Sequence, residues 1–480
     1  MNKYLLKLAD EKLRPHQIKA LRKLDQEGGI VVDHSTGSGK TKLYLTAIAK
    51  AQQENKKGQA LVIAPASLVT NIDREIDKHG IKIDRSRLTT LSYEMAVNKS
   101  QELRKMRPDI SIVDEAHKLR NTSTRRTKEL RDIIEESRKR VLGTGTTTYN
   151  HVSDIAPLVN IASGGWKVLP EGKKQFEQAF VDTKVERPDI LTRIAGGHSP
   201  KESKTLKKNK YLDKMLNKYV DRYDAKEDPT MNDKFPSSSE KTIEVEMSPE
   251  QRTVYKYLED KLPFGLRLKV RMNAKLTPEE TRKLQAFSQG IRQASNSIKP
   301  FMKNYDQITP KVRAAVDSLE HKQKKDKNFR GLVYSNYLKA GLDDYSKELE
   351  KRRISHAVYN GRLTSKQKDA IVADYNSGKI PVLLVSSAGS EGLDLKGTRL
   401  VQVLEPAWNK AKIEQVMGRA IRFNSHELLP PKSRHVEIEH YNSVHPKNWI
   451  GYRPNSIDQY LSSNGETKNI LNEELKDRIK

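Results

Sequence analysis

The sequence predicts an α/β protein with two doubly wound parallel sheets, and three observations lead to this fold class. Short apolar runs of strand length alternate with helix-compatible segments in both halves of the chain, as is typical of parallel sheets covered by helices on both faces. A glycine-rich loop joins the first apolar run to the next helical segment, which is where a phosphate-binding loop stands. Between the halves the composition becomes polar, lysine-rich and helical in period.

The expected strands form one set in each half. The first set covers residues 30–32, 60–64, 110–113 and 141–142, and the second covers 331–334, 356–359, 382–385 and 400–404. We therefore expect a first lobe, a segment of helical, lysine-rich protrusions and linker, and a second lobe with a C-terminal tail, over residues 1–161, 162–305 and 306–480. The polar residues 465–480 at the end of the tail are expected to fray.

The composition limits the partners and the compartment. Lysine and arginine number 89 against 62 aspartate and glutamate, a net charge of +27, which favours nucleic acid as a partner over the alternative of an anionic membrane surface. Because the chain has no cysteine, disulfides and cysteine-ligated zinc are excluded. No apolar run is long enough to span a bilayer, and the N-terminus lacks an apolar signal core. We therefore expect a cytoplasmic protein that is neither secreted nor bound to a membrane.

The glycine-rich loop covers residues 34–41, His-Ser-Thr-Gly-Ser-Gly-Lys-Thr. Small residues let backbone N–H groups converge on phosphate oxygens, and the following helix adds its dipole; the residues expected to do so are Gly37, Ser38 and Gly39. Lys40 is expected to reach the β- and γ-phosphates of ATP, and the Thr41 hydroxyl to hold Mg²⁺. His34 stands where the usual pattern has glycine. A plain turn between strand and helix is the alternative, which the Lys-Thr pair at the helix start disfavours.

A second set of candidate residues ends the apolar run that begins at Ile110. The sequence there is Asp114-Glu115-Ala116-His117, and adjacent carboxylates at a strand end suit a metal–phosphate site. Asp114 is expected to hold Mg²⁺ through water, and Glu115 to orient and deprotonate the attacking water. A charged loop after a strand is the alternative, but a phosphate-binding loop in the same half favours the site.

In their order along the first half, these residues resemble the motifs of the Swi2/Snf2 branch of helicase superfamily 2. Residues 13–17, Leu-Arg-Pro-His-Gln, resemble the adenine-reading Q motif, which implies that Gln17 contacts the base beside Arg14. The further resemblances are 64–71 to motif Ia, 90–94 to motif Ib, 114–121 to motif II with its basic tail, and 143–147 to motif III. The resemblance implies two RecA-like lobes with helical protrusions between them, and an ATPase that uses ATP and Mg²⁺.

The second half resembles the remaining motifs in the right order. Residues 333–335 resemble motif IV, 386–395 motif V and 415–422 motif VI, and the pair Trp408-Asn409 stands seven residues before Gln415, as in the Snf2 group. Arg419 and Arg422 are three residues apart, so on a helix they would share one face and reach the γ-phosphate from the second lobe, with Gln415 beside them. Two solvated arginines are the alternative reading of this pair.

Nucleic acid is expected to meet loop hydroxyls, amides and cations of these motifs, and such backbone contacts carry affinity without sequence information. The resemblance assigns them to Ser67, Asn71, Lys118, Asn121, Ser387, Gly389 and Trp408. It also implies that the lysine-rich segment 162–305 grips or guides duplex, although a charge run is more often a solvated face.

We therefore expect a monomeric ATP-dependent translocase on double-stranded DNA. The alternatives are a strand-separating helicase on DNA or RNA, a nucleotide-switched DNA clamp, and the motor subunit of a larger complex such as a restriction enzyme. Residues 426–441 resemble virus-encoded NTPases, which implies a phage or large-virus origin. It also implies remodelling of protein–DNA or transcription complexes, with RNA polymerase or another protein complex as a partner.

Overall fold

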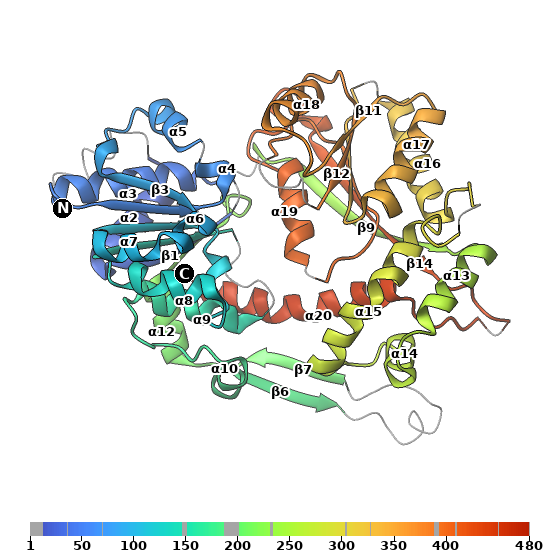
Figure 1. Ribbon diagram of the computed structural model, residues 1–480, viewed down its shortest axis with the longest axis horizontal. Helices are drawn as coiled ribbons and strands as arrows, with labels where there is room; N and C mark the ends of the chain where they lie inside the picture. The colour runs from blue at the N-terminus through green and yellow to red at the C-terminus, as the bar shows by residue number, and fades with distance from the viewer. Residues whose placement is uncertain are drawn as a thin grey trace. The chain divides into compact units, whose positions relative to one another are not determined.

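The chain folds into two compact units, which we call lobe 1 and lobe 2 (Figure 1). Lobe 1 comprises residues 1–184, 203–228 and 468–480, and lobe 2 comprises 185–202 and 229–467. The structure is a computed structural model, and it describes residues 13–35, 37–69, 71–145, 151–186, 201–230, 234–302, 305–326, 328–387, 393–408, 410–449 and 451–479.

The sheet of lobe 1 is parallel throughout. Its strands in spatial order are β3 (Leu88–Ser92), β2 (Ala60–Ala64), β4 (Ile110–Asp114), β5 (Lys139–Thr144), β1 (Gly29–His34) and β8 (Val220–Tyr223). The central strands are buried along almost their whole length. Burial on both faces explains why they read as continuous apolar runs in the sequence.

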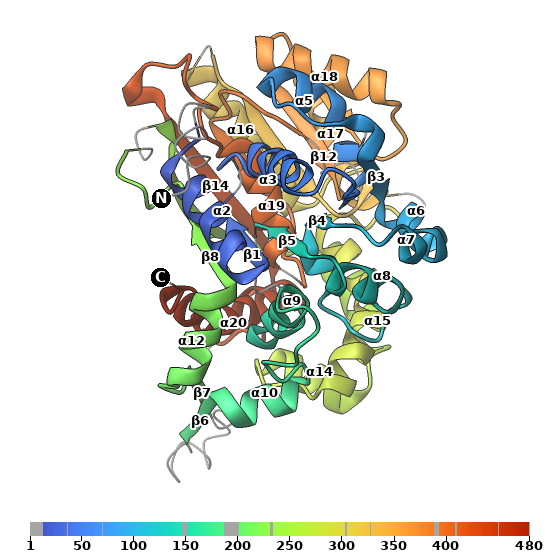
Figure 2. The same ribbon diagram turned by 90° about the vertical axis from the view of Figure 1, so that its left-hand side faces the viewer.

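Helices cover both faces of this sheet (Figures 1 and 2). Alternate residues of β1 show the two faces: Ile30 and Val32 pack with α2 (Pro15–Glu27), α3 (Lys40–Glu54) and α5 (Ile72–His79). Val31 packs with the opposite layer. That layer and its surroundings include α6 (Tyr93–Asn98), α7 (Ser100–Met106), α8 (Arg125–Glu135), α9 (Ile155–Ala162), α10 (Lys173–Phe180) and α12 (Lys210–Tyr219).

The sheet of lobe 2 is also parallel throughout. Its strands in spatial order are β11 (His356–Tyr359), β12 (Val382–Ser386), β10 (Gly331–Ser335), β13 (Leu400–Val403), β14 (His435–Val444) and β9 (Ser237–Glu246). One face packs on α16 (Pro310–Lys325) and α17 (Asp343–Lys351), and the other on α18 (Ser365–Ser377) and α19 (Lys410–Ala420). A separate apolar cluster joins α13 (Pro249–Glu259), α14 (Phe264–Arg271) and α15 (Pro278–Asn296). The predicted α/β fold with two parallel sheets is confirmed.

The middle of the chain is less helical than expected. β8 joins the sheet of lobe 1 and β9 the sheet of lobe 2, while β6 (Val181–Glu186) and β7 (Lys201–Leu206) form a small sheet of their own. β9 escaped detection because its side chains are exposed or half-buried and its sequence, Ser-Ser-Ser-Glu-Lys-Thr-Ile-Glu-Val-Glu, has no apolar run. The segment therefore completes both large sheets in addition to supplying helices.

The C-terminal residues were predicted to fray, but most of them form a helix that packs on lobe 1. Helix α20 spans Ile457–Asp477, and Leu471, Leu475 and Ile479 are buried in the core of lobe 1. Arg478 also donates hydrogen bonds to Asp213 and to the carbonyl oxygen of Leu206. The three apolar side chains recur every fourth residue, a helical period that the surrounding polar residues hid. No helix in the described part of the chain is long and apolar enough to cross a membrane.

Candidate active site

In lobe 1 the phosphate-binding loop, motif II and motif III meet at the carboxyl edge of one sheet. They follow β1, β4 and β5, and these strands are adjacent in the sheet. The register pairs Asp33 with Thr144 and Asp114 with Gly143. Ligands of open α/β sheets bind at this edge, so the topology brings together residues that lie far apart in the sequence.

The side chain of Lys40 is hydrogen-bonded to the backbone of the phosphate-binding loop. Gly37 and Gly39 adopt left-handed conformations, with φ of 84° and 88°, and α3 begins at Lys40. The Lys40 ammonium donates to the carbonyl oxygens of His34, at 2.5 Å, and Ser35, at 3.2 Å. Thr41 follows in the first turn, and the Ser38 side chain is buried. The lysine therefore lies over the loop, where phosphate oxygens would replace the carbonyls as its partners.

Gln17 contacts the loop directly. Its Nε2 donates to the carbonyl oxygen of Gly39 at 2.9 Å, and its Oε1 accepts from the backbone N–H of Arg14 at 2.9 Å. Its side-chain amide thus connects the start of α2 to the end of the phosphate-binding loop. The contacts of Gln17 and Arg14 with adenine stay predictions.

Two aromatic residues that the sequence analysis missed support the same loop. A hydrogen bond of 3.0 Å joins His16 Nε2 to the carbonyl oxygen of Ser38, and the His16 ring stacks on Tyr223 with 3.6 Å between centroids. Burial lowers the pKa of His16 to about 4, so its ring is neutral at pH 7. Tyr223 ends β8 and lies 207 positions after His16, and no sequence signal connected the two.

His34 can replace the glycine of the usual pattern because its side chain points away from the loop and contacts a residue of the neighbouring strand. Its Nε2 lies 2.7 Å from Asp221 Oδ2 on β8, and both side chains are almost fully buried. The imidazole therefore leaves the loop itself to the small residues. Asp221, like Tyr223, belongs to the middle segment and was not expected at this site.

Asp114 and Glu115 lie at the end of β4. Burial and the neighbouring charge of Glu115 raise the pKa of Asp114, while the charge of Lys40 opposes the shift. The Tyr44 hydroxyl donates to Asp114 Oδ1 at 2.9 Å. Glu115 has a left-handed backbone with φ of 53°, and its Oε2 lies 3.2 Å from His117 Nδ1.

The oxygen atoms present fit a Mg²⁺ ion that is shared with a nucleotide. Mg²⁺ is usually bound by one or two protein oxygens, with phosphates and waters completing its shell. The described residues hold no group of three or more acidic or histidine side chains that could bind a metal alone. Asp114 ends β4, and Thr41 lies in the first turn of the helix that follows β1; β5 separates these two strands at the same sheet edge. Their role as metal ligands stays a prediction.

The residues expected to meet nucleic acid from lobe 1 follow β2 and β4 at this edge. Ser67 belongs to α4 (Ala66–Val69), although its side chain is outside the described part, and Asn71 precedes α5. Asn121 is exposed, and its Oδ1 accepts from the Ser123 backbone and hydroxyl. The cations of Lys118 and of Arg126, a residue not expected here, each lie 5.2 Å from the centroid of the Tyr93 ring.

Lobe 2 has a pocket of mixed polar and apolar lining at the corresponding edge of its own sheet. The pocket has a volume of about 390 Å³ and opens where β10 and β12 end; its walls are Asn336, Tyr337, Leu338, Lys339, Ala340, Ser386, Ser387, Gln293 and Pro300. Ser386 is buried, and its hydroxyl has no hydrogen-bond partner among the described residues. Ser387 thus lies in this pocket, whereas Gly389 is outside the described residues.

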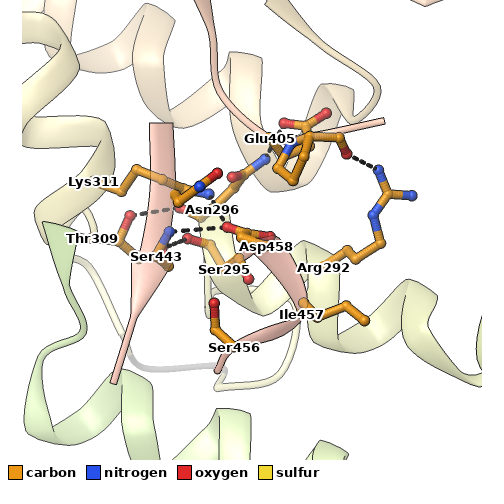
Figure 3. Close-up of polar contacts among 12 residues, drawn as sticks. Arg292, Ser295, Asn296, Thr309, Lys311, Glu405, Ser443, Ser456, Ile457 and Asp458 are labelled. Atoms are coloured by element: carbon orange, nitrogen blue, oxygen red, sulfur yellow. Dashed lines mark hydrogen bonds and ion pairs between the residues drawn. The ribbon is translucent and has the colours of Figure 1, made fainter. Parts of the chain in front are cut away.

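A buried carboxylate, that of Glu405, holds Asn336 of this pocket. Figure 3 shows Glu405 beside Asn296 and Arg292. Glu405 accepts hydrogen bonds from Asn296 Nδ2, at 2.6 Å, and from the backbone and side chain of Asn336, at 2.5 and 3.0 Å. Arg292 donates to the carbonyl oxygen of Pro406 and lies over the Tyr337 ring. Glu405 was missed, although it carries the signal that revealed Asp114, a carboxylate directly after an apolar strand.

Motif VI differs from the expectation in one respect. α19 ends at Ala420, so Arg419 lies in its last turn and Arg422 lies beyond it. The prediction that the two arginines share one helix face was therefore wrong. The Arg422 guanidinium contacts Asp394 at 3.2 Å and the carbonyl oxygen of Gly418. The Gln415 side chain is outside the described part, and Trp408 packs against the cluster of α13, α14 and α15.

Comparisons with known proteins agree with this arrangement. Three domain families match the chain: DEAD/DEAH box helicase over residues 14–112, SNF2-related domain over 85–304 and helicase conserved C-terminal domain over 310–424. A protein of Acanthamoeba polyphaga mimivirus, named an ATP-dependent RNA helicase, is 32% identical over 95% of this chain and 94% of its own. A termination factor NPH-I homolog of African swine fever virus is 26% identical over 94% of this chain and 75% of its own.

Among solved structures, the Sulfolobus solfataricus SWI2/SNF2 ATPase core in complex with dsDNA aligns with 98% of this chain and 97% of its own, at 19% identity and a TM-score of 0.38. The family assignment rests on the sequence relatives and on the three matched domains. The chain thus belongs to the Snf2-like branch of helicase superfamily 2, and it is an ATPase.

Proposed function

We propose that this ATPase is a translocase that moves along double-stranded DNA. The observation that carries the proposal is that each lobe has, at the carboxyl edge of its sheet, groups suited to phosphate oxygens. In lobe 1 these are the Lys118 and Arg126 cations, and in lobe 2 they are the pocket hydroxyls and amides with the exposed Lys339. Contacts of this kind would bind a nucleic-acid backbone without reading its sequence.

The ATP site supplies the chemistry for this cycle. Lys40 and the loop amides bind the phosphates, Thr41 and Asp114 hold Mg²⁺, and Glu115 activates the water that attacks the γ-phosphate. Arg419, Arg422 and Gln415 stabilise the developing charge on that phosphate from motif VI. Mg²⁺ held there would supply further neutralisation of phosphate charge.

Three features support duplex as the track. The SNF2-related match extends over residues 85–304, which includes the lysine-rich segment, and the net charge of +27 favours a polyanion. Phosphate contacts leave base stacking intact, whereas strand separation costs about 1.4 kcal/mol per base-pair step and needs a wedge. The name of the African swine fever virus relative, a termination factor homolog, supports action on a transcription complex.

A strand-separating RNA helicase is the second candidate, because the 32% identical mimivirus relative carries that name. It differs from the translocase in the nucleic acid that stimulates ATP hydrolysis, and in the need to melt base pairs. Both differences can be measured on one preparation.

Two assays decide between the candidates. We expect ATP-dependent displacement of a triplex-forming strand from duplex DNA, without unwinding of forked DNA or RNA duplexes. Glu115→Gln serves as the control, since displacement by a translocase requires hydrolysis. Efficient fork unwinding, or ATPase activity stimulated by RNA and not by duplex DNA, would replace the translocase by the helicase.

Binding to duplex is expected to be driven by the phosphate backbone. The logarithm of the affinity should fall linearly with the logarithm of the salt concentration, with a slope of about −0.9 for each phosphate neutralised. Fluorescence anisotropy with two duplexes of scrambled sequence measures both the slope and the specificity. An affinity that ignores salt, or that strongly prefers one of the two sequences, would contradict this mode of binding.

A further inference from the structure

Two buried tyrosines of lobe 1 contact the motif II residues from different sides. Tyr44 comes from α3 and Tyr93 from the start of α6. We propose that both are positioning residues for ATP hydrolysis: Tyr44 orients the Asp114 carboxylate for the metal, and Tyr93 fixes the backbone that carries Glu115. Neither phenol is assigned to contact the nucleotide.

Tyr44 is bound to the carboxylate itself. It follows Lys40 by one helical turn, is 2% exposed, and its hydroxyl donates to Asp114 Oδ1 at 2.9 Å. A tyrosine phenol is protonated at neutral pH, so it remains a donor to this carboxylate. A neutral donor in this place fixes the rotation of the carboxylate without competing for the metal as a charged partner would.

Gly143 shows that the fold reserves space for this hydroxyl. Gly143 pairs with Asp114 across β4 and β5. A Cβ atom at Gly143 would lie 1.6 Å from the Tyr44 hydroxyl oxygen, far inside van der Waals contact. Any side chain at this position would therefore displace the phenol from the carboxylate.

Tyr93 acts on the main chain. Its hydroxyl lies 2.6 Å from the carbonyl oxygen of Asp114 and 3.1 Å from that of Glu115, and the side chain is 1% exposed. Glu115 is held at φ of 53°, a conformation that is unfavourable for a residue with a Cβ and persists only where its surroundings enforce it. The Tyr93 hydroxyl shares its one proton between these two carbonyl oxygens, chiefly that of Asp114, and this contact supplies such enforcement.

Removal of each phenol oxygen should therefore produce a different defect. Loss of the Tyr44 hydroxyl frees the Asp114 side chain and should weaken metal binding. Loss of the Tyr93 hydroxyl frees the Glu115 backbone and should slow the chemical step while ATP binds as before. Phenylalanine preserves both rings, so packing in the core is retained.

The test for Tyr44 is a metal titration. Mn²⁺ is titrated into protein with ADP, and the free ion is followed by electron paramagnetic resonance. Tyr44→Phe should raise the dissociation constant of Mn²⁺ by about 10- to 100-fold, the usual effect of losing a partner of a metal ligand, while metal-free nucleotide affinity stays unchanged. An unaltered Mn²⁺ affinity in a folded Tyr44→Phe protein would overturn its role.

A double-mutant cycle tests the part of Gly143. Gly143→Ala should weaken Mn²⁺ binding at least as strongly as Tyr44→Phe, because it displaces the whole ring. In the Tyr44→Phe background the same change should have a smaller effect, since the hydrogen bond is already lost. Fully additive effects would overturn the link between the two residues.

The test for Tyr93 is steady-state ATP hydrolysis at saturating Mg²⁺. Tyr93→Phe should lower kcat by about 10- to 100-fold and leave KM for ATP within about twofold, the pattern of an interaction that matters in the transition state. The matched control is Tyr375→Phe in lobe 2, which also removes a buried phenol, one bonded to Thr398 at 2.9 Å. A wild-type kcat in Tyr93→Phe, or an equal loss in Tyr375→Phe, would overturn the proposal.

Discussion

Replacement of Glu115 by glutamine is expected to stop ATP turnover while ATP still binds. Glutamine has the shape of the carboxylate and loses only its ability to take a proton from the attacking water, which should lower kcat by about 10²- to 10⁴-fold. Lys40→Ala should behave differently, because it removes the ammonium from the phosphate-binding loop and hence both binding and hydrolysis. Phosphate release and the fluorescence of a labelled ATP measure the two properties separately.

Glu102→Gln is a suitable control for this experiment. Glu102 lies on α7 of the same lobe, and its side chain is 73% exposed, so its neutralisation should leave turnover unchanged. Turnover near the wild-type rate in Glu115→Gln would remove this residue from the catalytic site. Loss of ATP binding in that variant would show that its effect is on the loop and not on the water.

Replacement of Lys311 by methionine is expected to destabilise lobe 2 by about 3–5 kcal/mol, because it leaves a buried carboxylate without its counter-ion. Lys311 and Asp458 form an ion pair of 2.9 Å in which both side chains are completely buried (Figure 3). Asp458 Oδ2 also accepts from the backbone N–H of Ser443. The pair therefore joins α16, β14 and the start of α20.

Hydrogen exchange of the α16 and β14 amides measures this change within lobe 2. The double variant Lys311→Met/Asp458→Asn should regain much of the loss, since no charge stays buried and the amide oxygen still accepts from Ser443. Lys283→Met on α15, where the ion pair with Glu279 is exposed, should leave exchange unchanged. An equal and small effect in all three proteins would show that the pair is hydrated in solution.

The sequence predicted those parts of the fold whose signal is local. Continuous apolar runs marked the central strands, and the loops that follow them revealed Lys40 and Asp114. β8 and β9 were not predicted because neither sequence, Val-Asp-Arg-Tyr and Ser-Ser-Ser-Glu-Lys-Thr-Ile-Glu-Val-Glu, contains a continuous apolar run. The helical period of Leu471, Leu475 and Ile479 was present, but its partner surface on lobe 1 could not be read from the sequence.

In the candidate site, too, residues with a local sequence signal were predicted and residues that depend on distant segments were not. The residues expected to touch phosphate or metal were predicted from local motifs and from the resemblance to a family. The side chains that hold them, such as His16 and Tyr44, act through contacts between distant segments. Glu405 does the same for the pocket residue Asn336. Tyr44 resembles an ordinary core residue until Gly143 is seen beside it. Spacing along the chain contains no information about such pairs.

The place of β9 in the sheet has a consequence for the synthesis of the chain. It precedes every other strand of the lobe 2 sheet, yet it pairs only with β14, and the paired residues Ser237 and His435 are 198 positions apart. Until β14 leaves the ribosome, this strand has no neighbour in the sheet, and its unpaired backbone is open to association with other chains. The serine, glutamate and lysine side chains along β9 favour solubility of this strand before it is paired. Its polar character, which concealed it in the sequence, thus suits the long interval between its emergence and its pairing.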